Sequence, residues 1–252
     1  MLDGSHNDLL RQILQDLKGD QYVIVNCLNY KELNYFFIFA IESMKQGKHF
    51  IFQTAASAVK SLTQCDDIPP ITIKNANSVP GLIIVGSHVA KTTKQLNILK
   101  EEGKNLAPIE IDAQFVLHDS DTYFEQIIKQ AESDFLKGLN PLLYTSRREL
   151  DFASIDKRIE AGVYISKFLT KMIRDFPQKP SFVIAKGGIT SHDILAKGLK
   201  VPISRVLGQA APGVPILKMP LEHRWPGMVY VIFPGNVGED DTLKKVYQAI
   251  IS

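Results

Sequence analysis

The sequence predicts an α/β fold, a mostly parallel β-sheet flanked by helices. Short apolar runs rich in β-branched residues alternate with longer amphipathic stretches, which is the rhythm of β-α-β units. The runs are apolar throughout rather than at every second residue, and this favours strands that are covered on both faces. Ligands of such sheets bind beyond the carboxyl ends of the strands, so the functional residues are expected there.

The first part of the chain is expected to hold two strands and two helices. We expect strands over residues 22–27 and 49–53 and helices over residues 30–45 and 55–62. Residues 65–80 then bring Pro, Asn and Asp together in quick succession, which is the chemistry of turns and linkers. This segment predicts a domain boundary, with one domain over residues 1–75 and a second over residues 76–252.

The second part is expected to alternate strands and helices up to the end of the chain. Its longest predicted helix carries apolar residues at helical spacing, which predicts a buried stripe. We expect strands at residues 81–85, 108–111, 141–145 and 181–185, with two or three more within 203–233. Helices are expected at residues 91–102, 121–137, 154–174, 189–199 and 240–251.

Composition excludes several classes of function. The 252 residues include 29 basic and 27 acidic ones, and a net charge of +2 does not predict a nucleic-acid partner. Arg147 and Arg148 form a local basic pair, which we interpret as solvated surface. Cys27 and Cys65 have no zinc-ligand spacing, so no metal site is predicted, and two thiols suit a reducing cytoplasm. No signal sequence or membrane-spanning apolar stretch is present, which predicts a cytoplasmic protein without a membrane partner.

Three predicted strands end at glycine turns that precede a helix. The turns are residues 86–87, 187–191 and 233–238. Glycine lets backbone N–H groups converge, and the first turn of a helix presents unpaired N–H groups, so together they suit an anion. The hydroxyls of Ser87, Thr190 and Ser191 can donate to phosphate oxygens or simply cap a helix. None of the turns is a P-loop or a Rossmann fingerprint, so the pattern predicts a phosphorylated ligand without naming it.

Other side chains near these turns have two interpretations each. Lys186 either reaches a phosphate or lies on the surface, and the surface reading is favoured. His88 and His192 are candidates for proton transfer near neutral pH, but polar loop positions explain both. Asp240 and Asp241 either hold Mg²⁺ or complement a helix dipole in its first turn.

Five motifs resemble the four-carbon acid-sugar kinases, which phosphorylate threonate, erythronate and 3-oxo-tetronate types of sugar acid with ATP. The motifs follow the order found in the family and spread over most of the chain. They are residues 52–59 (FQTAASAV), 81–89 (GLIIVGSHV, followed by TTKQL at 92–96), 187–191 (GGITS), 209–215 (QAAPGVP) and 233–238 (FPGNVG).

The resemblance implies a two-domain kinase architecture. The sugar acid would be held on the front domain and ATP, with Mg²⁺, on the back domain. The positions implied to contact ATP or ADP are Ser87, Gly187, Gly188, Ile189, Thr190 and Gly235. The turns chosen from physical reasoning are therefore the ones that the resemblance also selects.

The chain departs from the family pattern in its first part. Nothing before Tyr22 resembles the Asp-Asp-x-Thr-Gly motif with which the family opens. Residues 1–75 are therefore expected to be the rear part of a truncated, incomplete front domain. Gln53 stands where the family has an arginine facing the substrate carboxylate, which loses a bidentate charged contact. Ile189 stands where the commoner family turn has Asp or Glu.

The predicted function is the ATP-binding portion of a sugar-acid kinase, with its general base in the missing segment and no catalytic residue assigned. Two partners are expected as alternatives: a second polypeptide that supplies the front half, or further copies of this chain, because unpaired strand edges associate. A non-catalytic nucleotide-binding remnant is the rival interpretation. A dinucleotide-dependent oxidoreductase is disfavoured because no GxGxxG is present.

Overall fold

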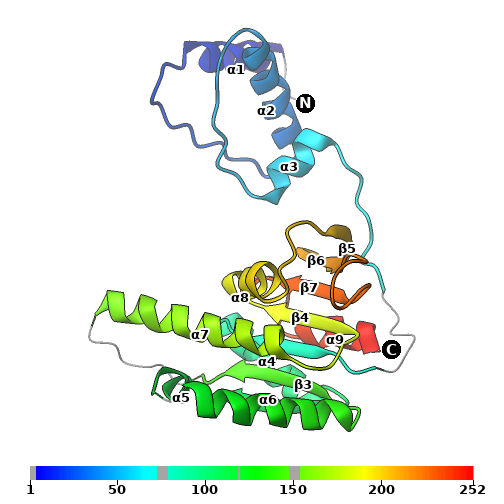
Figure 1. Cartoon of the computed structure of the whole chain (residues 1–252). Coiled ribbons are helices and arrows are strands. Elements are labelled where there is room, and N and C mark those ends of the chain that lie inside the picture. Colours follow the sequence, from blue (N-terminus) through cyan, green and yellow to red (C-terminus); the bar gives the residue numbers. More distant parts are fainter. Residues whose placement is uncertain (1–3, 73–78, 119, 148–153, 252) are drawn as a thin grey trace. The chain divides into compact units, whose positions relative to one another are not determined.

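The chain divides into two compact units, Met1–Ile68 and Pro69–Ser252 (Figure 1). The computed structural model describes residues 4–72, 79–118, 120–147 and 154–251. The boundary predicted between residues 75 and 76 lies outside the described residues. Each unit is described below by itself.

The first unit is helical where it is regular. Asn29 caps its longest helix, because the Asn29 side chain accepts a hydrogen bond from the Glu32 amide at 3.0 Å and donates to the Glu32 carboxylate at 2.8 Å. The helices expected at residues 30–45 and 55–62 are confirmed, whereas the first helix was not predicted. The helices are α1 (Gly4–Asp16), α2 (Tyr30–Lys45) and α3 (Ala56–Thr63).

The strands predicted at residues 22–27 and 49–53 are wrong. Both segments run without strand pairing, and no strand forms among the described residues of the first unit. Tyr22 and Ile51 are fully exposed, and Ile24 is 86% exposed. A strand needs a neighbour to pair its backbone N–H and C=O groups, and an apolar run does not by itself supply one.

The second unit is built on a seven-stranded sheet in the order β2-β3-β1-β4-β7-β6-β5. The first five strands in this order are parallel, β6 is antiparallel to β7, and β5 is antiparallel to β6. The predicted α/β fold with a mostly parallel sheet is confirmed. The strands are β1 (Leu82–Val85), β2 (Leu106–Ile111), β3 (Asn140–Thr145), β4 (Phe182–Lys186), β5 (Arg205–Ala211), β6 (Val214–Lys218) and β7 (Val229–Phe233).

Helices cover both faces of this sheet. Along β1, Leu82 and Ile84 face the core formed with α5, α6, α7 and Ile194, whereas Ile83 and Val85 face the core formed with α4 and α9. All four side chains are fully buried, which explains why the strand is apolar at every position. The helices are α4 (Ala90–Glu102), α5 (Ala113–His118), α6 (Ser120–Leu136), α7 (Ile155–Asp175), α8 (Gly188–Asp193), which continues as a π-helix (Ile194–Gly198), and α9 (Thr242–Ile251).

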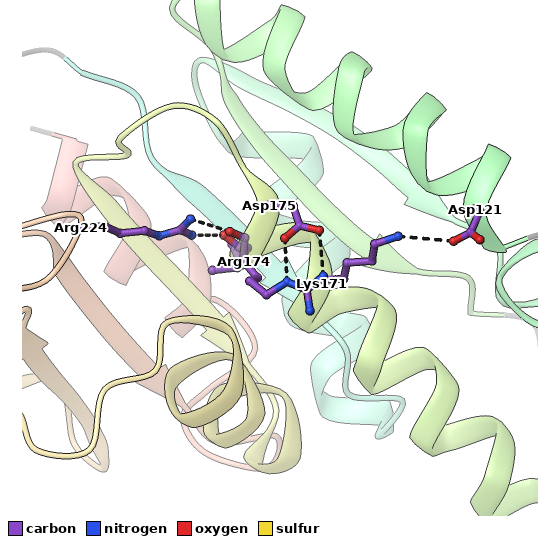
Figure 2. A network of polar contacts seen from close by, with 6 residues as sticks. Asp121, Lys171, Arg174, Asp175 and Arg224 are labelled. Carbon is purple, nitrogen blue, oxygen red and sulfur yellow. Dashed lines mark hydrogen bonds and ion pairs between the residues drawn. The ribbon is translucent and has the colours of Figure 1, made fainter.

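The C-terminal end of α7 is held by a network of polar contacts (Figure 2). Arg224 donates to the carbonyl oxygens of Ile173 and Arg174, which have no partner within the helix, and its guanidinium lies 3.9 Å from the centre of the Trp225 ring. Lys171 also reaches Asp121 of α6 at 3.4 Å. These contacts fix the point at which the chain leaves α7 to enter β4.

Within the part of the chain that the structure describes, no helix combines the length and the apolar character needed to cross a membrane.

Candidate functional site

The three predicted glycine turns lie together at the carboxyl ends of the parallel strands. Strands β1, β4 and β7 are adjacent and parallel, so their carboxyl ends lie side by side. The amide of Gly86 donates to Lys186 O at 3.1 Å, and the amide of Gly187 donates to Phe233 O at 2.8 Å. Backbone hydrogen bonds therefore tie the start of each turn to the end of the neighbouring strand.

Three glycines are required by the packing of the turns themselves. A Cβ on Gly235 would lie 2.8 Å from Ser87 Oγ, and one on Gly86 would lie 2.3 Å from Thr190 Oγ1. Gly187 has φ +125° and faces Ser87, whose Cβ would be 3.1 Å from an added Cβ. The side chain of Ser87 therefore sits in a close-fitting space between the turns that follow β4 and β7.

Gly188 differs from these three glycines. A Cβ added there would meet no atom within 4 Å, and its backbone is not in the left-handed region. The neighbouring Ile189 side chain is 75% exposed. No packing reason for a glycine exists at position 188, and open space lies beside its backbone.

The hydroxyls of this turn are engaged by the protein. Ser191 donates to Gly187 O at 2.7 Å, and Thr190 is buried against Gly86. The predicted phosphate contact of the Ser191 hydroxyl therefore competes with a hydrogen bond inside the protein, whereas the Thr190 hydroxyl is covered by packing. The backbone N–H of Ser191 also donates to Gly187 O, at 2.9 Å, so the amides of residues 188–190 are the groups left to consider for a ligand.

Helix α4 fixes the turn that follows β7. Thr92 Oγ1 donates to Gly235 O at 2.8 Å, Lys91 Nζ donates to Gly238 O at 2.9 Å, and Gln95 Nε2 donates to Glu239 O at 2.7 Å. Thr92 Oγ1 also lies 3.2 Å from Ser87 Oγ. No side chain caps the N-terminus of this 13-residue helix, so the amides of its first turn are free of a side-chain cap.

Lys186 is buried, so the favoured surface interpretation of this lysine is wrong. It is the last residue of β4 and is fully covered, and its Nζ donates to Pro234 O at 2.6 Å and to Gly235 O at 3.1 Å. The ammonium also lies 4.2 Å from the centre of the Phe233 ring. Burial, with the nearby charge of Lys91, lowers the pKa of Lys186 to about 8.

Arg147 is half-buried at the carboxyl ends of the parallel strands, which corrects its interpretation as solvated surface; its predicted neighbour Arg148 lies outside the described residues. Arg147 follows β3, and its guanidinium donates to Ser87 O, to Val85 O at 3.3 Å and to Thr145 Oγ1 at 3.4 Å. Burial lowers the pKa of this guanidinium from its ordinary value. Sequence reasoning missed the residue, although its place directly after a buried strand was a usable signal.

The structure gives little support to a metal site at Asp240 and Asp241 or to proton transfer by His88. Asp240 pairs with Lys94 at 3.7 Å and Asp241 pairs with Lys245 at 2.7 Å, so both carboxylates are engaged by lysines. No group of three or more potential metal ligands occurs among the described residues. His88 Nε2 lies 3.3 Å from Thr145 Oγ1.

The charges of the site suit an anion. The buried Lys186 and the half-buried Arg147 are both bound to backbone carbonyl oxygens, and among the residues described no carboxylate lies within ion-pair distance of either. Backbone amides, a serine hydroxyl and two cations therefore converge on one strand-end surface. Such a donor set matches the oxygens of a phosphate chain.

A second feature, a cavity of about 560 Å³, lies toward the amino ends of the parallel strands, away from the glycine turns. Its lining comes from the end of α7, the segment that leads into β5 and the segment between β6 and β7. The cavity and the glycine turns are therefore separate features of the second unit.

Comparison with protein families gives one match. A family model described as the nucleotide-binding C-terminal domain matches residues 82–243, a span that includes all three glycine turns. No curated protein sequence matches the chain significantly.

Solved structures that share the fold include the following two. A protein from Salmonella typhimurium LT2, described provisionally as a tRNA synthase, aligns with a TM-score of 0.65 and 15% identity over 98% of this chain and 56% of its own. A domain of unknown function from Bordetella bronchiseptica, solved with bound citrate as a domain-swapped dimer, aligns with a TM-score of 0.53 and 17% identity over 96% of this chain and 55% of its own. The chain therefore spans little more than half the length of either structure, and these identities establish the fold alone.

Proposed function

The chain belongs to the family of nucleotide-binding C-terminal domains of four-carbon acid sugar kinases, and from that premise we propose that it binds the phosphates of ATP or ADP at the carboxyl ends of β1, β4 and β7. The observation that carries this proposal is the open space beside Gly188. At the other turn glycines, protein atoms occupy the space that a Cβ would take. Position 188 instead leaves room for a ligand to approach the backbone. Lys186 lies within the same group of turns and supplies positive charge.

The proposed contacts are made mostly by the backbone. Amides of residues 188–190 and of Gly235 would donate to phosphate oxygens, and the Ser87 hydroxyl would add a donor between the two turns; the Gly187 amide is bound to Phe233 O. The exposed side chain of Ile189 offers an apolar surface to the adenine base. Mg²⁺ bound to the phosphates would supply charge neutralisation, and it would arrive with the nucleotide, since Asp240 and Asp241 are held by lysines.

The proposed activity is phosphoryl transfer from ATP to a four-carbon sugar acid of the threonate, erythronate or 3-oxo-tetronate type. Support for this finer step comes from family membership and from the motif at residues 52–59, which runs into α3 of the first unit. The first unit would be the rear part of a sugar-acid-binding domain. Lys186 would hold the turn after β7 in place and concentrate positive charge near the transferred phosphoryl group.

One observation favours a second candidate, a nucleotide-binding chain that acts only with a partner. Tyr22, Ile24 and Ile51 are largely exposed in extended segments that carry no strand pairing. A front-half subunit, or a second copy of this chain, could add strands to these segments. Sugar-acid phosphorylation by the purified chain alone would exclude the need for a subunit, and a monomer in light scattering would exclude self-association. A cytoplasmic location, suggested by the free thiols of Cys27 and Cys65, belongs to the same set of proposals.

The test is calorimetric titration with ADP and with Mg²⁺-ATP of the wild-type chain, Gly188→Val and Gly162→Val. Gly162 lies within α7, and like Gly188 it has no atom within 4 Å of an added Cβ. Both variants therefore add the same side chain at a helical position where its Cβ meets no other atom. We expect micromolar binding by the wild-type chain and by Gly162→Val, and at least tenfold weaker binding by Gly188→Val. Equal affinity in all three proteins, or no binding by the wild-type chain, would contradict the proposal.

A further inference from the structure

The segment that follows β3 lies next to the glycine turn that follows β1. Strand β3 is the neighbour of β1 in the sheet, with Tyr144 in register with Val85. Two residues beyond β3, Arg147 donates through Nη1 to Ser87 O and through Nη2 to Val85 O. One guanidinium therefore holds the end of β1 and the first residue of the proposed phosphate turn.

The guanidinium of Arg147 is only partly satisfied by the protein. Its Nε is buried and makes no hydrogen bond among the described residues. No carboxylate in the described part of the chain lies within ion-pair distance of it, and burial lowers its pKa. The carboxylate of Glu110 acts on this guanidinium only from beyond ion-pair distance. A partly desolvated cation without a close counter-ion is costly, and a bound anion would offset that cost.

Lys186, on the other side of Ser87, binds backbone carbonyl oxygens in the same way as Arg147 does. Its ammonium binds the carbonyl oxygens of Pro234 and Gly235, as the guanidinium of Arg147 binds those of Val85 and Ser87. A Cβ on Gly235 would touch Ser87 Oγ, so the two held turns are in direct contact. The turn at Ser87 is thus flanked by the buried Lys186 and the half-buried Arg147, each bound to backbone carbonyls.

We propose that Arg147 is a binding and positioning residue of the nucleotide site, which sets the Ser87 turn and supplies positive charge to the phosphates of the bound nucleotide. This inference rests on the proposed nucleotide binding, and it adds the turn after β3 to the three glycine turns. A purely structural role, tying the end of β1 to β3, is the competing explanation. The two explanations differ in what happens to affinity when the charge is removed but hydrogen bonding is kept.

The experiment compares Arg147→Gln, Arg147→Lys and the matched control Arg205→Gln with the wild-type chain. The amide of Gln can still donate to a carbonyl but has no charge, whereas Lys keeps the charge and loses the planar fork. Arg205 is exposed at the start of β5, at the opposite edge of the sheet. Dissociation constants for Mg²⁺-ATP and for inorganic pyrophosphate are measured at low and at high salt, and folding is checked by circular dichroism.

We expect Arg147→Gln to weaken both ligands about tenfold at low salt, with a flatter salt dependence, because a charge interaction has been lost. Arg147→Lys should recover part of the affinity, and Arg205→Gln should match the wild-type chain. Wild-type affinity and salt dependence in a folded Arg147→Gln protein would overturn the inference while leaving nucleotide binding intact. If Arg147→Gln does not fold, Arg147→Lys decides: wild-type affinity there overturns the positioning role, and a several-fold loss supports it. Absence of binding by the wild-type chain would overturn the proposed function and this inference together.

Discussion

Five glycines lie in the turns around the proposed phosphate site, and the four nearest Ser87 separate into two kinds. Gly86, Gly187 and Gly235 are glycines because atoms of Ser87 and Thr190 already occupy the space of a Cβ. Gly188 has no such neighbour, so its small size is explained by something outside the protein. Sequence reasoning chose all four positions but could not distinguish them, because the reason for each glycine lies in a different strand.

The first prediction follows from this division. Gly86→Ala should lower the free energy of unfolding by about 1–3 kcal/mol, because its Cβ would be placed 2.3 Å from Thr190 Oγ1. Gly188→Ala should leave the free energy of unfolding unchanged or raise it slightly, because alanine has a higher helix propensity than glycine. Urea denaturation of the two variants and the wild-type chain checks the prediction. A Gly188→Ala protein that is less stable than Gly86→Ala would contradict it.

The second prediction concerns pH. The pKa of Lys186 is lowered from 10.5 to about 8, so between these values the unfolded chain holds the proton and the folded chain does not. The contribution of Lys186 to the free energy of unfolding should therefore rise with pH across this window. Nucleotide affinity should change in the opposite sense and fall by up to about tenfold per pH unit above pH 8, because the site loses a positive charge.

Calorimetric titration and urea denaturation at pH 7, 8 and 9 measure these two trends. Lys186→Met serves as the control, since it has no charge to lose. We expect the variant to show weak binding at pH 7 and no further loss at pH 9. A wild-type affinity that does not change between pH 7 and 9 would show that the charge of Lys186 does not assist binding.

At the scale of elements, sequence reasoning succeeded where an element is buried by its own unit. The strand expected at residues 81–85 is β1, which is apolar at each position because two helical layers cover it. Residues 22–27 have the same apolar, β-branched texture but lie exposed and unpaired. Local pattern alone does not separate the two cases, because strand formation depends on a partner strand far away in sequence.

The buried charges show the same limit for single residues. Lys186 and Arg147 were assigned to the surface because lysine and arginine seldom lie in a core. Lys186 is instead covered and Arg147 half-buried at the carboxyl ends of the parallel strands, and both bind carbonyl oxygens in the turns after other strands. Those acceptors are remote in sequence, so only the topology β3-β1-β4-β7 brings the residues together.

The third prediction concerns the end of α7. Arg224→Ala removes two charged hydrogen bonds to the carbonyl oxygens of Ile173 and Arg174 and the stacking on Trp225. The free energy of unfolding should fall by about 1–2 kcal/mol. The affinity for Mg²⁺-ATP should stay within about twofold of the wild-type value, because the network lies where α7 leads into the start of β4, whereas the glycine turns follow the ends of the strands. A tenfold loss of affinity with unchanged stability would contradict both statements.

At the scale of the whole molecule, the second unit contains a complete sheet and both of its covered faces. The glycine turns, Lys186 and Arg147 all belong to it. The first unit contains no described strand, and its exposed apolar segments are the part of the molecule most open to a partner. Nucleotide binding and sugar-acid binding are therefore expected to be separable properties.

The fourth prediction tests this separation. A chain of residues 69–252 should fold on its own and bind Mg²⁺-ATP within about threefold of the full chain, because every proposed nucleotide contact is retained. Circular dichroism and calorimetric titration measure the two properties. A folded chain of residues 69–252 that has lost nucleotide binding would show that the first unit takes part in the site.

The central claim is the position of the nucleotide, and amide resonances from nuclear magnetic resonance report it most directly. The chain would be labelled with ¹⁵N and titrated with Mg²⁺-ATP. The account predicts the largest shifts at Ser87, Gly187, Gly188 and Gly235. No shifts, or shifts confined to residues 198–203 and 220–224 around the cavity toward the amino ends of the parallel strands, would contradict it.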